Sequence, residues 1–422
     1  MSWIRTKLEA FAGSVAGHEA GRVYLYSDFL ELLDQASNSL PFGAKQVIEV
    51  SCNTTIESLA SLLAIAQSRH IALPLPTELT KIERERMLKV AGESSIYEKL
   101  ESSGLILFSS GTSNEPKGML HNFEVLVNRY KDTSIRKDRC LQLLLIDHIG
   151  GLDTAFRCLF AGSTLVVPDE RTPEAVGLAI ESKKVNILPA SPTFFNLLLL
   201  AKIPKKYDLS SVRILAYGAE PMSQKLLKSL SKTFPKARLQ QKFGTSETGA
   251  IRIRSTKNES LFFSINDPET AWKIIEDELW LKTPSRIIGY LDSDQDQLKA
   301  DGWYATGDLV EDDGQGNLRI VGRTSEVINV GGQKVNPCEI ESILIELKGV
   351  ESVRVYGIKN PITGDGIACE IVSSECKSIS LWKREIRRHC RKELQLWKIP
   401  TNIIVVKKVE VNSRMKRKIK SL

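Results

Sequence analysis

Short apolar runs and amphipathic stretches alternate along the first 250 residues. QVIEVSC (residues 46–52) is an apolar run of strand type, ESLASLLAIAQSRH (57–70) has the periodicity of a helix, and IALPLP (71–76) is a strand closed by prolines. The same order returns in STLVVP, PEAVGLAIESKK and VNILPA (163–190), and again in VRILAYG followed by MSQKLLKSLSKTF (212–234). Strand, helix and strand in this order predict a parallel α/β sheet.

The pattern changes after about residue 250. ELWLKT (278–283), WYATGDLVEDDGQGNLRIVG (303–322) and EVINVGGQKV (326–335) are short β segments separated by Asp-Gly and Gly-Gly turns. Asn336-Pro337-Cys338-Glu339 is typical of a helix start, with Asn as cap, Pro at the first helical position and Glu closing a capping box. Strands and helices alternate from there to the end, as in an α+β unit.

These patterns predict an α/β protein with two domains. We expect a large N-terminal domain over residues 1–322, with parallel or mixed sheets and a β-rich portion. A small mobile α+β domain is expected over residues 323–422, with the boundary between Arg323 and Glu326. The length of 422 residues supports this division, because one hydrophobic core rarely serves so long a chain.

Composition narrows the class of protein. Hydrophobic residues at 42% and charged residues at 26% exclude a mainly disordered chain, a collagen-like repeat and a coiled-coil rod. The apolar stretch Leu59 to Ala66 is far shorter than the ~20 residues of a membrane helix, and the N-terminus shows no signal peptide. Seven cysteines without a C-x-x-C pair suit a reducing compartment. We therefore expect a soluble cytoplasmic protein without a membrane span.

The net charge of +7 is modest for this length. It is compatible with an anionic partner such as a nucleotide or an acidic carrier protein, and equally with a solvated basic surface. No recognisable nucleic-acid-binding motif accompanies it, so we expect no nucleic-acid partner.

A loop rich in small hydroxyl residues follows one apolar strand. LILF (105–108) runs into Ser109, Ser110, Gly111, Thr112 and Ser113, and Lys117 and Gly118 close the loop. Backbone N–H and side-chain O–H groups of such a loop can converge on phosphate oxygens, and the lysine adds charge. The spacing is not that of a Walker loop, and an ordinary surface turn has the same composition.

The segment Ser-Ser-Gly-Thr-Ser-x-x-Pro-Lys-Gly closely resembles the signature of the adenylate-forming superfamily. Its members are acyl- and aryl-CoA ligases, the adenylation domains of peptide synthetases, and luciferases. The resemblance extends over nearly the whole chain, and further segments follow in the family's order. It implies that Ser109, Ser110, Gly111, Thr112, Ser113 and Lys117 bind the phosphates of ATP.

Lys242-Phe243-Gly244-Thr245-Ser246-Glu247 is similar to the family's Tyr-Gly-x-Thr-Glu segment. The resemblance implies that the ring of Phe243 stacks on adenine, that Gly244, Thr245 and Ser246 line the nucleotide site, and that Glu247 holds Mg²⁺. Mg²⁺ is a hard cation that prefers oxygen ligands, so a carboxylate suits it.

Trp303-Tyr304-Ala305-Thr306-Gly307-Asp308 resembles the segment whose aspartate accepts hydrogen bonds from both ribose hydroxyls, a role that an acceptor-only carboxylate suits. Arg323 matches the residue that contacts ribose and phosphates. At the hinge position the family commonly has Asp or Lys, and this chain has Ser325. Rotation remains plausible, because a hinge needs only a residue that tolerates changed backbone angles.

Two weaker matches complete the nucleotide site. Gly218, Ala219 and Glu220 resemble the stretch along the adenine ring, although a β-to-α turn has the same composition. Lys416 matches the family's catalytic lysine, which normally follows a glycine. Met415 replaces that glycine, and Lys418 and Lys420 offer neighbouring registers. The alternative is a basic tail on a solvated surface.

The substrate pocket is less defined. His148 lies where amino-acid-activating members place an aspartate for the α-ammonium, as a histidine does in many acyl- and aryl-CoA ligases, so we expect an acid without an α-amino group. Pocket walls are expected from Phe194 and Phe195 and from residues near Gly249 and Ala250. Gly331 and Gly332 would line the tunnel for the pantetheine thiol, although a tight β-turn has the same sequence.

The resemblance implies ATP-dependent activation of a carboxylic acid to an acyl-adenylate, with Lys416, His148, Thr112 and Glu247 as the catalytic set. Thioester formation with CoA would follow. The alternative acceptor is the phosphopantetheine of an acyl carrier protein, which the basic stretch from Arg384 to Lys398 could contact. A minor alternative is a non-catalytic nucleotide-binding protein, suggested by Ser325 and Met415. The identity of the acid and the oligomeric state stay open.

Overall fold

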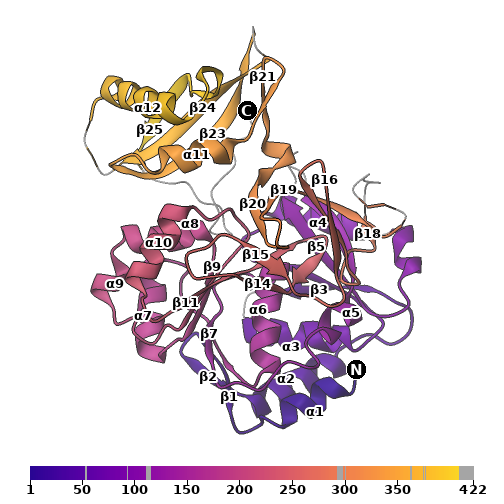
Figure 1. Ribbon diagram of the computed structural model, residues 1–422. Helices are drawn as coiled ribbons and strands as arrows, with labels where there is room; N and C mark the ends of the chain where they lie inside the picture. The colour runs from indigo at the N-terminus through magenta and orange to yellow at the C-terminus, as the bar shows by residue number, and fades with distance from the viewer. Residues whose placement is uncertain are drawn as a thin grey trace.

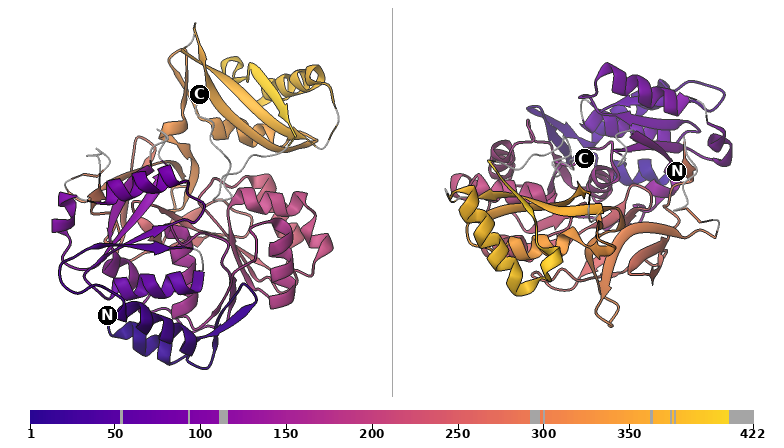
Figure 2. Two further views of the ribbon diagram at one scale, coloured as in Figure 1. Left: turned by 180° about the vertical axis from the view of Figure 1, so that it is seen from behind. Right: turned by 90° about the horizontal axis from the view of Figure 1, so that it is seen from above.

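The computed structural model describes residues 1–52, 55–92, 94–110, 116–291, 298–299, 301–361, 364–373, 375 and 377–407. A large body holds the elements up to β20 (Leu318–Arg323), and a small body begins with β21 (Ile328–Val330) (Figure 1). The views from behind and from above show the small body over one end of the large one (Figure 2). The α/β architecture expected from the sequence, with a large N-terminal and a small α+β C-terminal domain, is confirmed.

A seven-stranded sheet forms one half of the large body. Its strands, in spatial order, are β11 (Arg238–Gln241), β10 (Ile214–Tyr217), β9 (Ile187–Ala190), β7 (Arg139–Leu141), β8 (Thr164–Val166), β1 (Val15–Glu19) and β2 (Arg22–Leu25). All neighbours are parallel except β1 and β2, because helices connect the strands of this sheet from β7 onward. Leu141, Leu188, Leu215 and Leu239 point to one face and pack against helices there.

A five-stranded sheet forms the second half. Its order is β18 (Gly289–Tyr290), β6 (Pro116–Asn122), β5 (Gly104–Ser110), β4 (Ile71–Leu75) and β3 (Val47–Ser51). Strands β3, β4 and β5 are parallel, whereas β6 and β18 run antiparallel to their neighbours. This confirms the parallel strand, helix and strand unit predicted for residues 46–76.

The helices of the large body cover these sheets. They are α1 (Trp3–Glu9), α2 (Tyr26–Asn38), α3 (Thr55–Ala66), α4 (Lys81–Gly92), α5 (Phe123–Asn128), α6 (Ile149–Phe160), α7 (Pro173–Lys183), α8 (Pro192–Leu200), α9 (Ile203–Lys206) and α10 (Gln224–Thr233). Helix α3 is apolar almost all round because it contacts strands of both sheets. No helix in the described part of the chain is long and apolar enough to cross a membrane.

Antiparallel strands complete the large body. A six-stranded sheet runs in the order β14 (Ile253–Ser255), β15 (Phe263–Ile265), β20, β19 (Tyr304–Asp312), β17 (Glu278–Lys282) and β16 (Ala271–Ile275). Strands β12 (Phe243–Thr245) and β13 (Gly249–Ile251) form a separate hairpin. These strands are the β-rich portion predicted after residue 250.

The small body folds around a five-stranded sheet with two helices. Its elements are β21, β22 (Gln333–Val335), α11 (Pro337–Leu344), β23 (Val350–Asn360), β24 (Gly364–Ser373), α12 (Ile379–Glu393) and β25 (Asn402–Val406). Asn336 caps α11 as predicted, since its side chain accepts from the Cys338 N–H at 3.1 Å. Glu339, expected to close a capping box, instead pairs with Lys398, whose Nζ lies 2.8 Å from both carboxylate oxygens.

Trp382 of α12 is fully buried in the core of the small body. Trp382→Ala is expected to destabilise this domain by about 3–5 kcal/mol through lost burial and the resulting cavity. Denaturant unfolding followed by hydrogen exchange should show early opening of β23 to β25 while α3 stays protected. Leu396→Ala, at a residue 75% exposed, is the control and should leave unfolding unchanged. Simultaneous loss of protection in both domains would contradict the prediction.

Candidate active site

A cleft of about 2350 Å³ lies between the two domains and continues into the large one. Several segments predicted to bind nucleotide meet at its walls. These residues are Ser109, Lys117, His148, Gly218, Ala219, Glu220, Phe243, Gly244, Thr245, Ser246, Glu247, Ala250, Asp308, Arg323 and Ser325. Because they come from loops and strand ends of four different sheets, the fold gathers at one place side chains that are far apart in the sequence.

The phosphate loop connects two antiparallel strands. Ser109 at the end of β5 pairs with Lys117 on β6, so both half-buried side chains stand at the base of the same hairpin. Gly111, Thr112 and Ser113 lie outside the described residues, as does the side chain of Ser110. The base of the hairpin thus carries one hydroxyl and one ammonium group into the cleft.

The turn before Glu247 is fixed by its neighbours. The hydroxyl oxygen of Thr245 accepts hydrogen bonds from the backbone N–H groups of Glu247 at 3.2 Å and Thr248 at 3.1 Å. Gly244 permits the close strand approach, because a Cβ there would lie 2.3 Å from the carbonyl oxygen of Gly249. Thr245 therefore positions Glu247 through its hydroxyl and is itself buried.

Glu247 presents its carboxylate to the cleft. The hydroxyl of Tyr290 donates to its Oε1 at 3.3 Å, and the Glu247 backbone carbonyl accepts from the Ile287 N–H at 2.7 Å. Burial first, and then the Glu247 carboxylate, raise the pKa of Tyr290 well above its ordinary value, so this phenol stays a donor. Within the described residues no group of three acidic, histidine or cysteine side chains forms a metal cluster.

Asp308 and Arg323 face each other across the antiparallel pair β19 and β20. The Arg323 Nε lies 2.8 Å from Asp308 Oδ1, and the Asp308 residue is only 4% exposed. Burial raises the pKa of Asp308 to about 6, although Arg323 opposes this shift. The pair places an acceptor and a cation side by side, as a ribose and phosphate site requires.

The stretch from Gly218 to Glu220 forms the turn after β10. A Cβ on Gly218 would meet the Lys242 carbonyl at 2.7 Å, and Ala219 has a left-handed backbone with φ +69°. The Glu220 carboxylate accepts from the backbone N–H of Thr193 at 3.2 Å. Glu220 therefore holds this turn against the start of α8, while Gly218 allows close contact with the segment before Phe243.

Phe243 is 8% exposed, and its ring centroid lies 5.5 Å from that of Phe263. The ring belongs to the apolar core of the antiparallel sheet and also borders the cleft. Stacking on adenine stays a prediction for this residue.

His148 precedes α6 and borders the cleft with its side chain 16% exposed. Its Nε2 lies 3.3 Å from Asp147 Oδ2. Of the two small residues expected nearby, Ala250 lines the cleft, and Gly249 is buried in a left-handed conformation with φ +75°.

The expectation for Phe194 and Phe195 was wrong. Both rings are fully buried in the core between the seven-stranded sheet and its outer helices. Helix α8 contacts α7, α9 and α10, so side chains on several of its faces are covered. These rings support the sheet and do not form a pocket wall.

Ser325 lies in a short 3-10 turn, Thr324–Glu326, between the last large-domain strand and the first small-domain strand. Gly331 and Gly332 form the exposed two-residue turn of the β21–β22 hairpin, with φ +57° and +84°. In this arrangement the hairpin tip is not part of the cleft wall. Lys416 lies outside the described residues.

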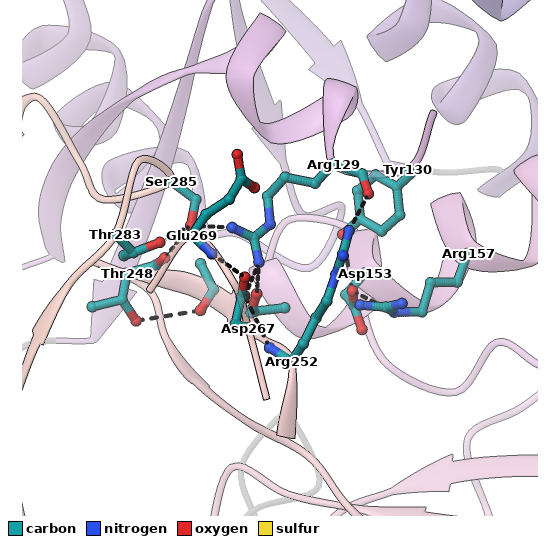
Figure 3. A network of polar contacts seen from close by, with 12 residues as sticks. Arg129, Tyr130, Asp153, Arg157, Thr248, Arg252, Asp267, Glu269, Thr283 and Ser285 are labelled. Carbon is teal, nitrogen blue, oxygen red and sulfur yellow. Dashed lines mark hydrogen bonds and ion pairs between the residues drawn. The ribbon is translucent and has the colours of Figure 1, made fainter. Parts of the chain in front are cut away.

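The structure adds a charged group that the sequence did not reveal. Asp153 and Arg157 on α6 and Lys242 before β12 all line the cleft (Figure 3 shows the first two with Tyr130). Asp153 and Arg157 follow His148 and are four residues apart. This spacing could have indicated a charged pair next to the site, because residues at i and i+4 share one helix face.

Two side chains of the large domain also hold the small domain. The Lys225 Nζ donates to the carbonyl oxygens of Ile345 at 2.6 Å and Val350 at 3.0 Å. The Asn196 Nδ2 donates to the carbonyl oxygen of Glu351 at 3.2 Å. Because Ile345 is the C-cap of α11, the lysine also meets the negative end of that helix.

Lys225→Met is expected to loosen this arrangement of the domains. Losing two hydrogen bonds from a charged donor should shift the equilibrium between domain orientations by about tenfold or more. Distance distributions between labels on the two domains should broaden. Lys228→Met, at an exposed position on the same helix, should leave them unchanged. Identical distributions for both variants would contradict the prediction.

Two family models match this chain. Residues 95–280 match the model of AMP-binding enzymes, and residues 339–416 match the model of the AMP-binding enzyme C-terminal domain. Together the matches cover more than half of the chain and include segments from both sides of the cleft.

Named relatives agree with these matches. The chain is 27% identical over 358 residues to 4-coumarate--CoA ligase-like 9 of Arabidopsis thaliana, covering 76% of this chain but only 63% of that protein. It is 25% identical over 433 residues to a 2-succinylbenzoate--CoA ligase of Enterococcus faecalis, covering 95% of this chain and 87% of that protein.

The solved structure of an anthranilate CoA ligase, AuaEII, in complex with anthranoyl-AMP superposes with a TM-score of 0.83. The match covers 99% of this chain and 95% of that one. At 18% identity this likeness shows the fold. The fold, the gathered segments and the two family models lead to one conclusion: the chain belongs to the adenylate-forming superfamily of AMP-binding enzymes.

Proposed function

We propose that this protein is an AMP-forming acid-thiol ligase, which activates a carboxylic acid with ATP and transfers the acyl group to CoA. The observation that carries the proposal is the shared cleft of Asp308, Arg323 and Glu247 with the base of the Ser109–Lys117 hairpin. This set provides an acceptor for a diol, cations for phosphates and a carboxylate for a divalent ion. The named relatives are ligases of the same reaction class.

The nucleotide is held by charge and shape. The Asp308 carboxylate accepts hydrogen bonds from the ribose hydroxyls while Arg323 beside it binds ribose and phosphate oxygens. Lys117 and Ser109, at the base of the hairpin, contact the β- and γ-phosphates. The base lies along the Gly218 turn, beside the ring of Phe243.

Glu247 fits the requirement for a magnesium ion. Mg²⁺ is usually bound through one or two carboxylates together with substrate phosphates and water, and Glu247 supplies one carboxylate at the cleft. When bound, the ion neutralises charge on the pyrophosphate leaving group. The Tyr290 hydroxyl, which donates to Glu247, keeps that carboxylate directed at the site.

In the first step a carboxylate oxygen of the substrate attacks the α-phosphorus of ATP. The new bond joins that oxygen to phosphorus, and the bond to the bridging oxygen of pyrophosphate breaks. Positioning and charge neutralisation account for most catalysis of this type, and Lys416 with Thr112 and the phosphate loop provides the charge. His148 at the start of α6 borders the place of the acid, which lacks an α-amino group.

In the second step the thiolate of CoA attacks the acyl carbonyl carbon, and AMP leaves with the oxygen that linked it to the acyl group. The thiol proton passes to solvent. Rotation about Ser325 would bring the Gly331–Gly332 turn from its exposed position to the thiol path, where the missing side chains leave room. The small domain thus serves the two steps in two orientations.

A carrier protein is the second candidate acceptor. Helix α12 exposes a row of cations along one side, namely Arg384, Arg387, Arg388, Arg391 and Lys392. Such a surface complements an acidic carrier protein that delivers its phosphopantetheine thiol.

We place the reaction in the cytoplasm, where ATP and CoA are available. The six cysteines that the structure describes are all free, as expected for a reducing compartment. Burial raises the pKa of Cys52 and Cys369 to about 12, so these thiols are poor nucleophiles and take no part in acyl transfer.

The test is acid-dependent release of pyrophosphate from ATP over a panel of aryl, short-chain and long-chain acids. Each acid is assayed alone, with CoA and with a holo-carrier protein. Turnover that rises with CoA supports the ligase, and turnover that rises only with the carrier protein supports the alternative. ATP binding without pyrophosphate release from any acid would leave a non-catalytic nucleotide-binding protein.

A further inference from the structure

The cleft continues from His148 along the whole of α6. The first three residues of the helix line the cleft, and after them the lining residues recur every three or four positions: Asp153, Thr154, Arg157 and Cys158. They therefore form one face of the helix. A substrate whose carboxylate lies near His148 extends along this face into the large domain.

The opposite wall is the second face of the seven-stranded sheet. Alternate residues of β9, β10 and β11 point into the cleft, namely Ile187, Pro189, Ile214, Ala216, Arg238 and Gln240. Their neighbours in sequence point to the other face and pack in the core. This wall carries small and apolar side chains together with Gln240 and Arg238, and it faces a charged group on α6.

Asp153 is the centre of that polar group. Its Oδ1 accepts from the Tyr130 hydroxyl at 2.9 Å and from the Arg157 Nε at 2.8 Å, and its Oδ2 lies 4.0 Å from the Lys242 Nζ. Burial alone would raise the pKa of Asp153, but Arg157 and Lys242 together lower it. One carboxylate therefore faces two cations.

Asp153 does not cover the charged groups of the two cations completely. The side chains of Lys242 and Arg157 are 40% and 38% exposed, and both line the cleft. Among the contacts that the structure describes, Arg157 uses its Nε and leaves the two terminal nitrogens for other partners. Burial lowers the pKa of Lys242, and Asp153 only partly offsets this, so another anion near the ammonium would stabilise its charged form.

A second group of charges lies next to this one and makes its contacts within the protein. Arg129 pairs with the buried carboxylate of Asp267, and Arg252 donates to the Arg129 carbonyl oxygen at 2.9 Å (Figure 3). Lys242 and Arg157 are the two cations that share the Asp153 carboxylate, so these three residues carry a net charge of +1.

We propose that the acid activated by this enzyme carries a second anionic group at its far end, such as a second carboxylate, and that Lys242 and Arg157 bind this group. The inference rests on the proposed function and names the substrate class of the same site. One added negative charge would neutralise the one excess positive charge of the cluster, and the terminal nitrogens of Arg157 match a carboxylate in geometry.

The helix sets the length of the substrate. Asp153 follows His148 by five residues, and at 1.5 Å per residue this is about 7 Å along α6. A spacing of this order corresponds to a dicarboxylic acid with a short chain or a single aromatic ring between its two acid groups.

The experiment compares matched acids that differ only in the second charge. Hexanoate is paired with adipate and benzoate with 4-carboxybenzoate, and kcat/KM is measured from pyrophosphate release. For at least one pair, the wild-type protein should show a kcat/KM for the diacid that is about tenfold to a hundredfold higher than for the matched monoacid. This is the range for a charge-assisted hydrogen bond. Equal or better turnover of both monoacids would overturn the inference while leaving the ligase function intact.

Variants separate recognition from structure. Lys242→Met should lower kcat/KM for the diacid about tenfold or more relative to kcat/KM for the monoacid, because only the diacid loses a partner. Lys242→Arg should retain much of the preference, and Lys228→Met is the surface control. A uniform loss for both acids with Lys242→Met would show a purely structural lysine and would overturn the inference.

Binding measurements keep the inference testable without turnover. If no acid releases pyrophosphate, the proposed function fails, and calorimetric titration with adipate and hexanoate decides the second question. Tighter binding of adipate by the wild type than by Lys242→Met supports the anionic subsite. Equal binding by the two proteins overturns it.

Discussion

Asp308→Asn is expected to lower the affinity for ATP by about a hundredfold. The substitution removes the charged acceptor for two ribose hydroxyls, and two charge-assisted hydrogen bonds together correspond to about 3 kcal/mol. It also leaves the Arg323 guanidinium without the carboxylate that lies 2.8 Å from its Nε. The Kd is measured by calorimetry, and a melting curve shows whether the variant is folded.

Asp312→Asn is the matched control. Asp312 lies on the same strand, is exposed, and accepts a hydrogen bond from the Gly314 N–H that an asparagine can also accept. This variant should bind ATP like the wild type. Normal ATP affinity in folded Asp308→Asn would refute the assignment of the ribose site.

The same carboxylate predicts a pH dependence. The pKa of Asp308 is raised to about 6, and only the ionised form accepts from both hydroxyls. Affinity is therefore full above the pKa and falls as the pH drops through 6, to about one tenth at pH 5. Adenosine is the probe, because it carries no phosphate that titrates in this range. Asp308→Asn should bind adenosine weakly and without this pH dependence.

Lys416→Ala is expected to reduce adenylate formation by a factor of about 10²–10³. A cation directed at the developing charge on the α-phosphate is worth this much in comparable sites. ATP binding should remain nearly unchanged, because Lys117, Arg323 and Asp308, which line the cleft, are the residues proposed to hold the nucleotide. Single-turnover formation of acyl-adenylate separates the two effects.

Lys418→Ala and Lys420→Ala are the controls, since both lysines lie in the same basic segment. They should retain adenylate formation if Lys416 occupies the family's lysine position. A large loss with Lys418→Ala and a normal rate with Lys416→Ala would shift the assignment by two residues.

Much of the fold could be predicted because local patterns carried it. The parallel strands β3, β4 and β8 to β10 coincide with apolar runs that helical stretches separate in the sequence. Asn336 caps α11 where the sequence predicts a helix start. The ribose pair was predictable only through the family resemblance, because nothing local indicates that Asp308 and Arg323 face each other across a hairpin.

What the sequence did not reveal depends on packing and on long-range contact. Phe194 and Phe195 became core residues because helices cover α8 on more than one side. Lys242 approaches Asp153 because β11 and α6 lie across one cleft, and neither segment alone indicates the other. Glu339 pairs with Lys398, which lies far away in the sequence, and this contact could not be predicted from the start of α11 alone.

The hydrogen bonds that Lys225 and Asn196 of the large domain make to the small domain are accepted by main-chain atoms. Lys225 and Asn196 reach the carbonyl oxygens of Ile345, Val350 and Glu351, and every amino acid has such an oxygen. Mutational drift on that surface of the small domain therefore leaves the contact in place as long as the backbone keeps its path. A C-terminal domain exchanged from a distant homologue should dock on this large domain without compensating changes, which makes the two halves separately evolvable.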